Sequence, residues 1–207
     1  RLPLKKAPHI VHGNALKIDW NEVIPASRLS YMMGNPPFVG HHYQTSEQKV
    51  DQLRTMGYLS AYGVLDYVCN WYVRAAEYVQ ENKAIRCALV STNSICQGEQ
   101  AGILWPDLLR RGIKIHFAHR TFQWSSEARG KAAVHCIIVG FGLQNSPEKL
   151  IFDYDTPQSE PHSIKADNIN PYLVDGPNVV VTNRTLPLCN VPKMCWGNKP
   201  TDGGHLI

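Results

Sequence analysis

The sequence predicts an α/β fold built on a mostly parallel sheet, with an antiparallel pair of strands at one edge. Short apolar segments typical of strands alternate with segments of helical periodicity, which is the pattern of parallel sheets. Late in the chain, two strand-like segments follow each other without a helix between them, and such neighbours pair antiparallel. The chain has 207 residues, 43% of them hydrophobic, which is enough for one sizeable core.

Three short apolar segments predict strands in the first half of the chain. One ends at Ile10 and Val11, a second covers residues 29–33, and a third covers residues 85–90. We expect the second to be a buried strand, since its residues are mostly apolar.

Two segments predict amphipathic helices. Over residues 64–79, apolar side chains recur at i, i+3, i+4 and i+7, and we interpret the aromatic residues among them as core. The second helix is predicted for residues 100–111. It ends before Gly112, because glycine favours the position after a helix. Pro106 marks either a kink or a later start of this helix.

Residues 113–118 and 133–141 predict the two late strands, and a polar loop that contains Phe122 and Trp124 separates them. From about residue 145 prolines and short β-type runs, at residues 150–154 and 179–182, replace the helical periodicity. We therefore predict one domain over residues 1–145 and the start of a β-rich second region over residues 146–207. The alternative is that residues 146–207 elaborate the same domain.

Charge, cysteines and hydropathy limit the possible functions. The net charge of +4 is compatible with a polyanionic partner without requiring one. The six cysteines form no Cys-x-x-Cys pair, which indicates buried free thiols in a reducing compartment. No apolar run reaches the roughly 20 residues that cross a bilayer. We expect a cytoplasmic protein with no membrane partner and, because it begins with Arg1, a fragment of a longer one.

Residues 34–38 read Gly-Asn-Pro-Pro-Phe and carry the most specific chemistry of the chain. The Asn35 side chain offers a carbonyl acceptor. Pro36 and Pro37 fix φ and remove two backbone donors, and the residue before each proline is extended. Asn35 and the Pro36 carbonyl can therefore accept both hydrogens of a planar amino group whose ring stacks on Phe38. The alternative is an ordinary turn at the end of a strand.

Together with three further segments in the same order, this motif resembles the amino-group methyltransferases of nucleic acids. The segments are residues 9–20, residues 86–93 with the helix that follows, and Phe122-Gln-Trp124 with residues 131–141. The closest resemblance is to the DNA adenine-N6 methyltransferases of single-chain type II restriction-modification enzymes, the MmeI-like group. It implies a Rossmann-like class I methyltransferase sheet, incomplete at its N-terminus, with a late antiparallel hairpin and the start of a target-recognition region.

The resemblance implies methyl transfer from S-adenosylmethionine to the N6 amino group of adenine in double-stranded DNA. The catalytic residues that it implies are Asn35, Pro36, Pro37 and Phe38. The cofactor-binding residues that it implies are Asn14, Ala15 and Asn35. The target base must be flipped out of the duplex, and the residues implied to stack on it are Phe38, Phe122 and Trp124.

Part of the cofactor site is expected to lie outside this chain. Methyltransferases of this fold hold the methionine end of the cofactor on a glycine-rich turn after the first strand. The one Gly-x-Gly sequence here, Gly140-Phe-Gly142, ends a late strand and opens no helix. We therefore predict that the isolated chain binds S-adenosylmethionine weakly or not at all and is inactive. The resemblance also implies a larger polypeptide with a nuclease, which no motif in this chain supports.

Four basic residues around the aromatic loop are candidates for DNA phosphate contacts, namely Lys114, Arg120, Arg129 and Lys131. An equally weighted alternative is that they only form a solvent-exposed charged surface. We expect no metal ion, because the adjacent His41 and His42 lack a carboxylate cluster and methyl transfer to an amino group needs none. We interpret these two histidines as part of a mobile loop. The other histidines in predicted strands, namely His116, His119 and His135, are interpreted as satisfied core or edge residues.

Three other functions remain open. RNA guanine-N2 methyltransferases and methyltransferases of a protein glutamine amide carry the same kind of motif, because their substrates also present a planar NH2 group. The aromatic loop and the C-terminal region favour the DNA enzymes. The third alternative is a non-catalytic nucleic-acid-binding relic of the fold, and the intact motif at residues 35–38 argues against it.

Overall fold

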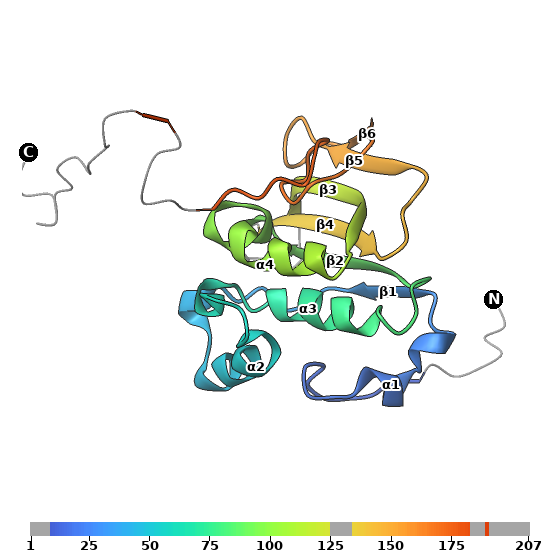
Figure 1. Cartoon of the computed structure of the whole chain (residues 1–207), viewed down its shortest axis with the longest axis vertical. Coiled ribbons are helices and arrows are strands. Elements are labelled where there is room, and N and C mark those ends of the chain that lie inside the picture. Colours follow the sequence, from blue (N-terminus) through green and yellow to red (C-terminus); the bar gives the residue numbers. More distant parts are fainter. Residues whose placement is uncertain (1–8, 125–133, 183–188, 191–207) are drawn as a thin grey trace, which may run out of the picture.

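In the described parts of the chain, a six-stranded mixed sheet forms the centre of the molecule (Figure 1). The computed structural model describes residues 9–124, 134–182 and 189–190, and of Trp124 and Val134 it describes the backbone. The strands, in their order across the sheet, are β1 (Tyr31–Gly34), β2 (Arg86–Thr92), β4 (Val134–Gly142), β3 (Lys114–Trp124), β5 (Lys149–Asp153) and β6 (His162–Ala166). Strands β1 and β2 are parallel, as are β3 and β5, whereas the other neighbours are antiparallel. The predicted α/β class is confirmed.

The sequence predicted that the antiparallel pair β3–β4 forms one edge of the sheet. This prediction is wrong, because the pair lies inside the sheet. Strand β5 pairs with the outer side of β3, and β6 pairs with β5, so the chain after residue 145 first continues the same sheet. Strand β6 was not predicted because its residues are mostly polar and exposed. Residues 179–182 form no strand.

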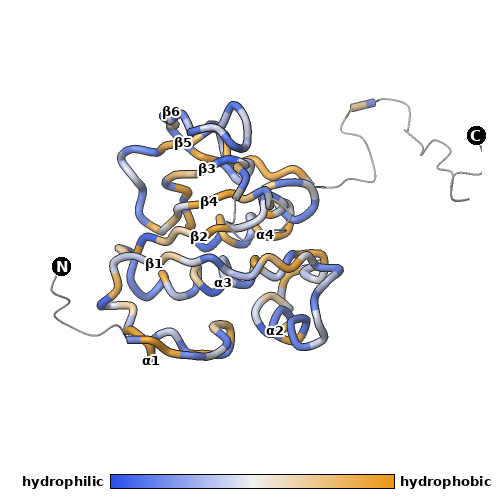
Figure 2. Tube along the Cα trace, turned by 180° about the vertical axis from the view of Figure 1, so that it is seen from behind, coloured by the Kyte–Doolittle hydropathy of each residue, from blue (hydrophilic) through white to orange (hydrophobic). Residues whose placement is uncertain are grey.

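Helices α3 (Cys69–Tyr78) and α4 (Gly98–Arg110) pack on one face of the sheet (Figure 1). The Tyr72 ring of α3 stacks on Phe141 of β4 with centroids 5.4 Å apart, and its hydroxyl hydrogen-bonds Ser91 of β2 at 2.8 Å. Seen from behind, hydrophobic segments gather in the central strands β2 and β4 (Figure 2). The core therefore lies between these strands and the two helices.

Helix α3 is shorter than the predicted helix over residues 64–79. Residues 62–64 form a 3-10 turn and Leu65 is extended, so the α-helix begins only at Cys69. Leu65 and Val68 are nevertheless fully buried, which explains why the apolar pattern starts before the helix does. Helix α4 matches its prediction and retains Pro106 in its interior.

Helix α2 (Ser46–Met56) was not predicted; it and a short helix, α1 (Trp20–Val23), lie at opposite sides of the lower part of the view in Figure 1. A capping box starts α2, in which Thr45 and Gln48 exchange hydrogen bonds between side chain and backbone. The buried residues of α2 are Asp51, Gln52, Thr55 and Met56, and all but the last are polar. Because the helix buries polar groups, hydrophobic periodicity could not reveal it.

The predicted burial of the strand over residues 29–33 is wrong. Strand β1 is exposed and not buried, since Tyr31 is 68% and Met33 84% exposed. In the described residues, β1 pairs with β2 alone, and an open hollow of about 480 Å³ lies over the face opposite the helices. Of the predicted strand that ends at Ile10 and Val11, residues 9–11 form no strand, and the residues before them lie outside the described ranges. Within the described chain, no helix has the length and apolar character needed to span a membrane.

Candidate functional site

The Asn-Pro-Pro-Phe motif (residues 35–38) leaves the sheet directly after the last residue of β1. Gly34 lies opposite Leu89 of β2, and a Cβ atom at Gly34 would come within 3.0 Å of the Leu89 side chain, so this close approach favours glycine. Pro36 is buried and Phe38 packs against the core, whereas Asn35 is exposed. The motif is therefore held at two points while the Asn35 amide is open to a ligand.

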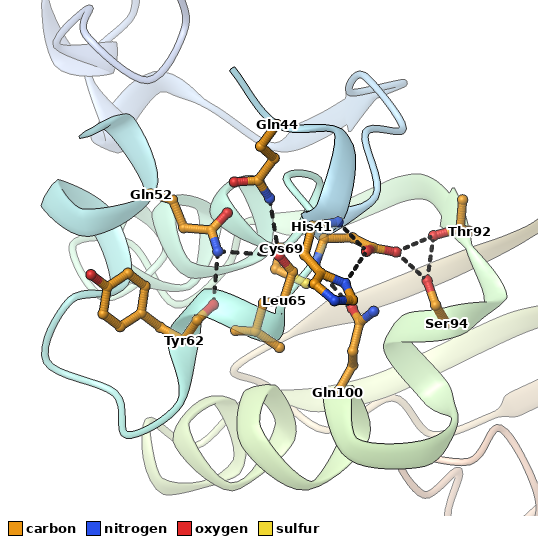
Figure 3. A network of polar contacts seen from close by, with 10 residues as sticks. His41, Gln44, Gln52, Tyr62, Leu65, Cys69, Thr92, Ser94 and Gln100 are labelled. Carbon is orange, nitrogen blue, oxygen red and sulfur yellow. Dashed lines mark hydrogen bonds and ion pairs between the residues drawn. The ribbon is translucent and has the colours of Figure 1, made fainter. Parts of the chain in front are cut away.

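The loop after the motif is fastened to residues 65–67, the segment that precedes α3 (Figure 3). The Asp66 carboxylate accepts the backbone N–H of His41 at 3.1 Å, and the His41 ring lies 3.8 Å from the same oxygen. The backbone N–H of Tyr67 donates to the Val39 carbonyl at 2.8 Å. Gln44 donates its side-chain amide to the Leu65 carbonyl at 3.0 Å. Hydrogen bonds thus anchor the chain on the C-terminal side of Phe38.

The same carboxylate reaches the end of β2. Asp66 is 8% exposed and accepts from the Ser94 hydroxyl at 2.6 Å and the Thr92 hydroxyl at 3.5 Å. Its backbone N–H donates to Gln100 of α4 at 3.0 Å. Asp66 therefore joins three segments: its carboxylate bonds the loop after the motif and the end of β2, and its backbone N–H bonds the start of α4.

Asn14 and Ala15 lie in a second loop, which α2 supports. The Asn14 side-chain amide donates to Asp51 of α2 at 2.9 Å, and its oxygen accepts the backbone N–H of Leu16 at 2.9 Å. Trp20 holds the same loop by donating its indole N–H to the Ala15 carbonyl at 2.8 Å. Asn14 and Ala15 are partly exposed, so a ligand can reach both.

The Tyr67 hydroxyl links this second loop to the first. It donates to Asp51 at 3.0 Å, while the backbone N–H of the same residue holds Val39. Burial, followed by the bond to Asp51, raises the pKa of Tyr67 to about 12, so the hydroxyl stays a donor at neutral pH. Residues 65–67 therefore hold both the predicted catalytic loop and the predicted cofactor loop.

Phe122 and Trp124 lie at the same edge of the sheet as the motif, although they belong to β3 and not to a separate loop. Phe122 pairs with Cys136 of β4, which in turn pairs with Thr92 at the end of β2. Three strand spacings separate β1 from β3, which is about 14 Å at the usual spacing. The Trp124 backbone ends β3 opposite Val134, and the side chain lies outside the described parts.

An aromatic cluster surrounds Phe122. Its ring stacks on Tyr154 with centroids 5.6 Å apart, and the Tyr154 hydroxyl hydrogen-bonds Nδ1 of His119 at 2.8 Å. His119 stacks on Phe152 with centroids 4.3 Å apart. Burial lowers the pKa of His119 below its ordinary value. The predicted role of His119 as a satisfied strand residue is thereby confirmed.

The structure does not bring the four predicted phosphate-binding residues together. Arg120 forms an ion pair of 2.7 Å with Asp153 at the aromatic end of β3. Lys114 is exposed at the opposite end of this strand, roughly 25 Å from Phe122 at the usual rise per residue. Arg129 and Lys131 lie outside the described residues.

The other histidines are placed as follows. His41 and His42 belong to a 3-10 turn, His41–Tyr43, and the backbone N–H of His41 donates to Asp66. His116 is buried and its Nε2 hydrogen-bonds the Gln144 carbonyl at 2.8 Å, and burial lowers its pKa. His135 is exposed in β4. Within the described ranges, no group of three or more histidine, cysteine or acidic side chains has an arrangement that could hold a metal ion.

Sequence reasoning missed the polar residues that support the two loops. These are Asp51, Asp66, Tyr67 and Ser94. A sequence signal existed for α2, since Thr45 and Gln48 have the spacing of a capping box. Asp66 was also visible as a single acidic residue within an apolar run, where an unpaired charge is costly.

Comparisons with known proteins identify relatives of this chain. The sequence model of a family described as "MmeI, DNA-methyltransferase domain" matches residues 1–153. DNA methyltransferase A of Bacillus subtilis (strain 168) is 42% identical over 209 residues, which cover 100% of this chain and 23% of that protein. A solved structure of the type IIL restriction-modification enzyme MmeI in complex with DNA has 56% identity and a TM-score of 0.91, covering 99% of this chain and 27% of that one. The chain therefore spans about a quarter of the length of these relatives.

Proposed function

The chain belongs to the MmeI DNA-methyltransferase family, and we propose that it forms part of the catalytic domain of a restriction-modification enzyme that methylates the N6 amino group of adenine in DNA. The single observation that carries this proposal is the Asn-Pro-Pro-Phe motif at the end of β1. The exposed Asn35 amide stands beside a buried Pro36 and a packed Phe38. This is an acceptor site for a planar amino group, held from both sides.

The motif acts by positioning and by electrostatics. The lone pair of adenine N6 is delocalised into the ring, so the free amine is a poor nucleophile. The Asn35 side-chain oxygen and the Pro36 carbonyl would accept its two hydrogens and favour a tetrahedral nitrogen whose lone pair points at the methyl donor. The Asp66 contact to His41 restrains the loop that follows, which keeps the two acceptors in place.

The second loop fits the adenine end of S-adenosylmethionine. The Asn14 oxygen accepts one hydrogen bond from Leu16 and retains a lone pair. Ala15 is partly exposed, and its backbone N–H makes no hydrogen bond to another described residue. This acceptor and this donor complement the amino group and N1 of adenine. When bound, the cofactor supplies an electrophilic methyl group on its sulfonium sulfur.

The aromatic residues at the same edge are proposed to hold the flipped base. Phe38 and Phe122 present ring systems at the ends of β1 and β3, and Trp124 follows in the chain. Unstacking a base costs a few kcal/mol of free energy, and stacking the flipped base on an aromatic side chain contributes roughly 1–3 kcal/mol of favourable free energy. Stacking on these rings therefore offsets much of the cost of base flipping.

DNA and the remainder of a longer polypeptide are the proposed partners. The related MmeI structure is a complex with DNA, and this chain covers 27% of that protein. We propose that the region from residue 146 leads toward target recognition, after β5 and β6 have completed the sheet, and that a nuclease lies elsewhere in the polypeptide. Arg120, Arg129 and Lys131 remain proposed phosphate contacts, and Arg120 would have to exchange Asp153 for a phosphate.

The test uses the full-length protein and a panel of tritiated methylation assays on duplex DNA, RNA and protein. The wild type is expected to methylate duplex DNA at adenine N6. Asn35→Ala should abolish transfer, since the amine loses an acceptor, while the dissociation constant for DNA stays the same. Asn145→Ala is the matched control, because Asn145 is exposed beyond the other end of β4. Full activity of Asn35→Ala, or methylation of RNA or protein instead of DNA, would refute the proposal.

A further inference from the structure

Asp51 is a buried carboxylate that faces the proposed cofactor loop. It lies on α2, is 1% exposed, and accepts from Asn14 Nδ2 at 2.9 Å and from the Tyr67 hydroxyl at 3.0 Å through one oxygen. Its other oxygen is buried without a hydrogen bond in the described chain, and the cations of Lys17 and Arg54 lie 3.8 and 3.9 Å from it. Two donors therefore face one oxygen of the Asp51 carboxylate, and two cations lie near the other.

This anion determines the orientation of the Asn14 amide. An ionised carboxylate only accepts hydrogen bonds, so the Asn14 group that faces it must be the NH2 group. The backbone N–H of Leu16 donates to the opposite side of the amide and so requires the oxygen there. The two contacts agree, and a reversed amide would lose both and place its oxygen against a carboxylate at 2.9 Å.

We propose that Asp51 is a positioning residue of the cofactor site, which orients Asn14 so that the side-chain oxygen faces the 6-amino group of the cofactor adenine. This inference rests on the proposed function, because it takes Asn14 and Ala15 as the adenine site. A reversed amide would present a donor and favour a 6-oxo base such as hypoxanthine. Asp51 would thus determine base selectivity without touching the ligand.

The neighbouring residues support an acceptor at position 51. The Tyr67 hydroxyl donates to the same oxygen as Asn14, and burial keeps that hydroxyl protonated. Glu47, the other acidic neighbour, is exposed and bonds Lys17 at 2.7 Å, so it does not compete for Asn14. Glu47 thereby offers a control that removes a nearby charge and leaves the Asn14–Asp51 contact intact.

The experiment exchanges the two groups in the full-length protein. Binding of S-adenosylhomocysteine, and of its analogue with hypoxanthine in place of adenine, is measured by titration calorimetry, with the thermal midpoint as a folding check. Asn14→Asp places two carboxylates in contact and should weaken S-adenosylhomocysteine binding by roughly tenfold or more, the scale of one lost charged contact. The double variant Asn14→Asp with Asp51→Asn restores a donor facing an acceptor. It should return the affinity to within about threefold of the wild type.

Two single variants complete the design. In Asp51→Asn, residue 51 can present either its oxygen or its NH2 group to the Asn14 amide, so both orientations of Asn14 become possible. We therefore expect a smaller preference for the adenine ligand over the hypoxanthine ligand, with an unchanged thermal midpoint. This variant also tests the inference if Asn14→Asp does not fold. Glu47→Gln should bind both ligands as the wild type does.

The binding results distinguish a failure of the positioning role of Asp51 from a failure of the proposed function. Restored affinity in the double variant, with reduced base preference in Asp51→Asn, supports the positioning role. A double variant as weak as Asn14→Asp, or an unchanged base preference in Asp51→Asn, overturns that role and leaves the proposed function standing. Normal binding by Asn14→Ala would remove Asn14 from the cofactor site and overturn the positioning role of Asp51, whereas the proposed methyl transfer is tested separately by Asn35→Ala.

Discussion

The Asp66 carboxylate accepts the backbone N–H of His41 at 3.1 Å, three residues after the Asn-Pro-Pro-Phe motif. The next residue, Tyr67, donates its hydroxyl to Asp51, which holds Asn14. A three-residue segment before α3 therefore holds both the loop with the proposed target-amine acceptors and the loop with the proposed cofactor acceptor. Methyl transfer requires the target amine to lie in line with the methyl group of the cofactor. A change in this segment is therefore expected to affect the rate of transfer more than the affinity for DNA or for the cofactor.

Asp66→Asn should lower kcat roughly 10- to 100-fold, the range that a misplacement of about 1 Å produces. An asparagine puts an NH2 group where an oxygen now accepts from His41 or Ser94, so at least one buried donor loses its partner. We expect the KM for DNA to change little, because Asp66 is buried and its carboxylate is taken up by contacts within the protein. Steady-state kinetics of the full-length enzyme measure both constants.

Asp155→Asn is the control for this variant, because Asp155 is exposed and contacts only His162, at 3.8 Å, among the described residues. Its kcat should equal that of the wild type. If Asp66→Asn lowers the thermal midpoint but leaves kcat unchanged, Asp66 stabilises the fold without positioning the catalytic loop.

Phe122→Ala should impair base flipping. The Phe122 ring stacks on Tyr154 at the edge where the motif lies, and its removal takes away one proposed stacking surface, worth roughly 1–3 kcal/mol. With 2-aminopurine at the methylated adenine position, the fluorescence rise on binding should be several times smaller than for the wild type. Tyr154→Phe keeps the ring and loses only the hydroxyl bond to His119, so it should flip the base normally. Equal fluorescence for Phe122→Ala and wild type would exclude Phe122 from the base pocket.

The sequence predicted those elements whose residues bury an apolar face locally. Helix α4 and strands β2 and β4 came from such patterns, and the end of α4 came from Gly112. Strand β1 was predicted but its burial was wrong, because the burial of a strand depends on what covers it. Helix α2 was missed because it buries Asp51, Gln52 and Thr55 in place of apolar residues.

The motif of the candidate site was predictable, but its support was not. Asn35 and its prolines form a local pattern, whereas the contacts that hold the loops join residues far apart in sequence. Asn14 and Asp51 are 37 positions apart, and His41 and Asp66 are 25 apart. The capping box of α2 and the single acidic residue Asp66 in its apolar run were visible in the sequence, but neither signal identifies the distant loop that the carboxylate contacts.

Gly112→Ala should destabilise the domain by about 1–2 kcal/mol, the cost of a left-handed conformation for a residue with a Cβ atom. Gly112 has φ of +83° and ends α4 in a Schellman arrangement, in which Gly112 donates to Leu109 and Ile113 donates to Leu108. A Cβ atom there would meet the Leu143 side chain at an ordinary 3.6 Å, so the cost is conformational.

The thermal midpoint of Gly112→Ala, together with hydrogen exchange of the α4 peptides, measures this cost. Gly63→Ala is the matched control, because a Cβ atom at Gly63 meets nothing within 4 Å and its φ is ordinary. Equal midpoints for the two variants would contradict the proposed conformational cost.

The buried cysteines should resist thiol reagents up to alkaline pH. Cys69, Cys87, Cys96 and Cys136 are buried and free, whereas Cys189 is exposed. Burial raises the pKa of the Cys87 thiol to about 12 and also raises that of the other three. Since the thiolate is the reactive form, peptide mapping after alkylation at pH 7 and pH 9 should find Cys189 modified and the four buried thiols intact.

The same shifts predict how stability depends on pH. In the unfolded chain a thiol loses its proton near pH 8.5, whereas in the folded chain the buried thiols keep theirs. The contribution of the buried thiols to the free energy of unfolding is therefore complete below about pH 8.5. It is lost as the pH rises toward the pKa of the thiols in the folded chain, so the thermal midpoint should fall over this range. Cys87→Ser is expected to reduce that fall, because its hydroxyl does not ionise there, and Cys189→Ser should not. Rapid alkylation of Cys69 or Cys96 in the folded protein would contradict their burial.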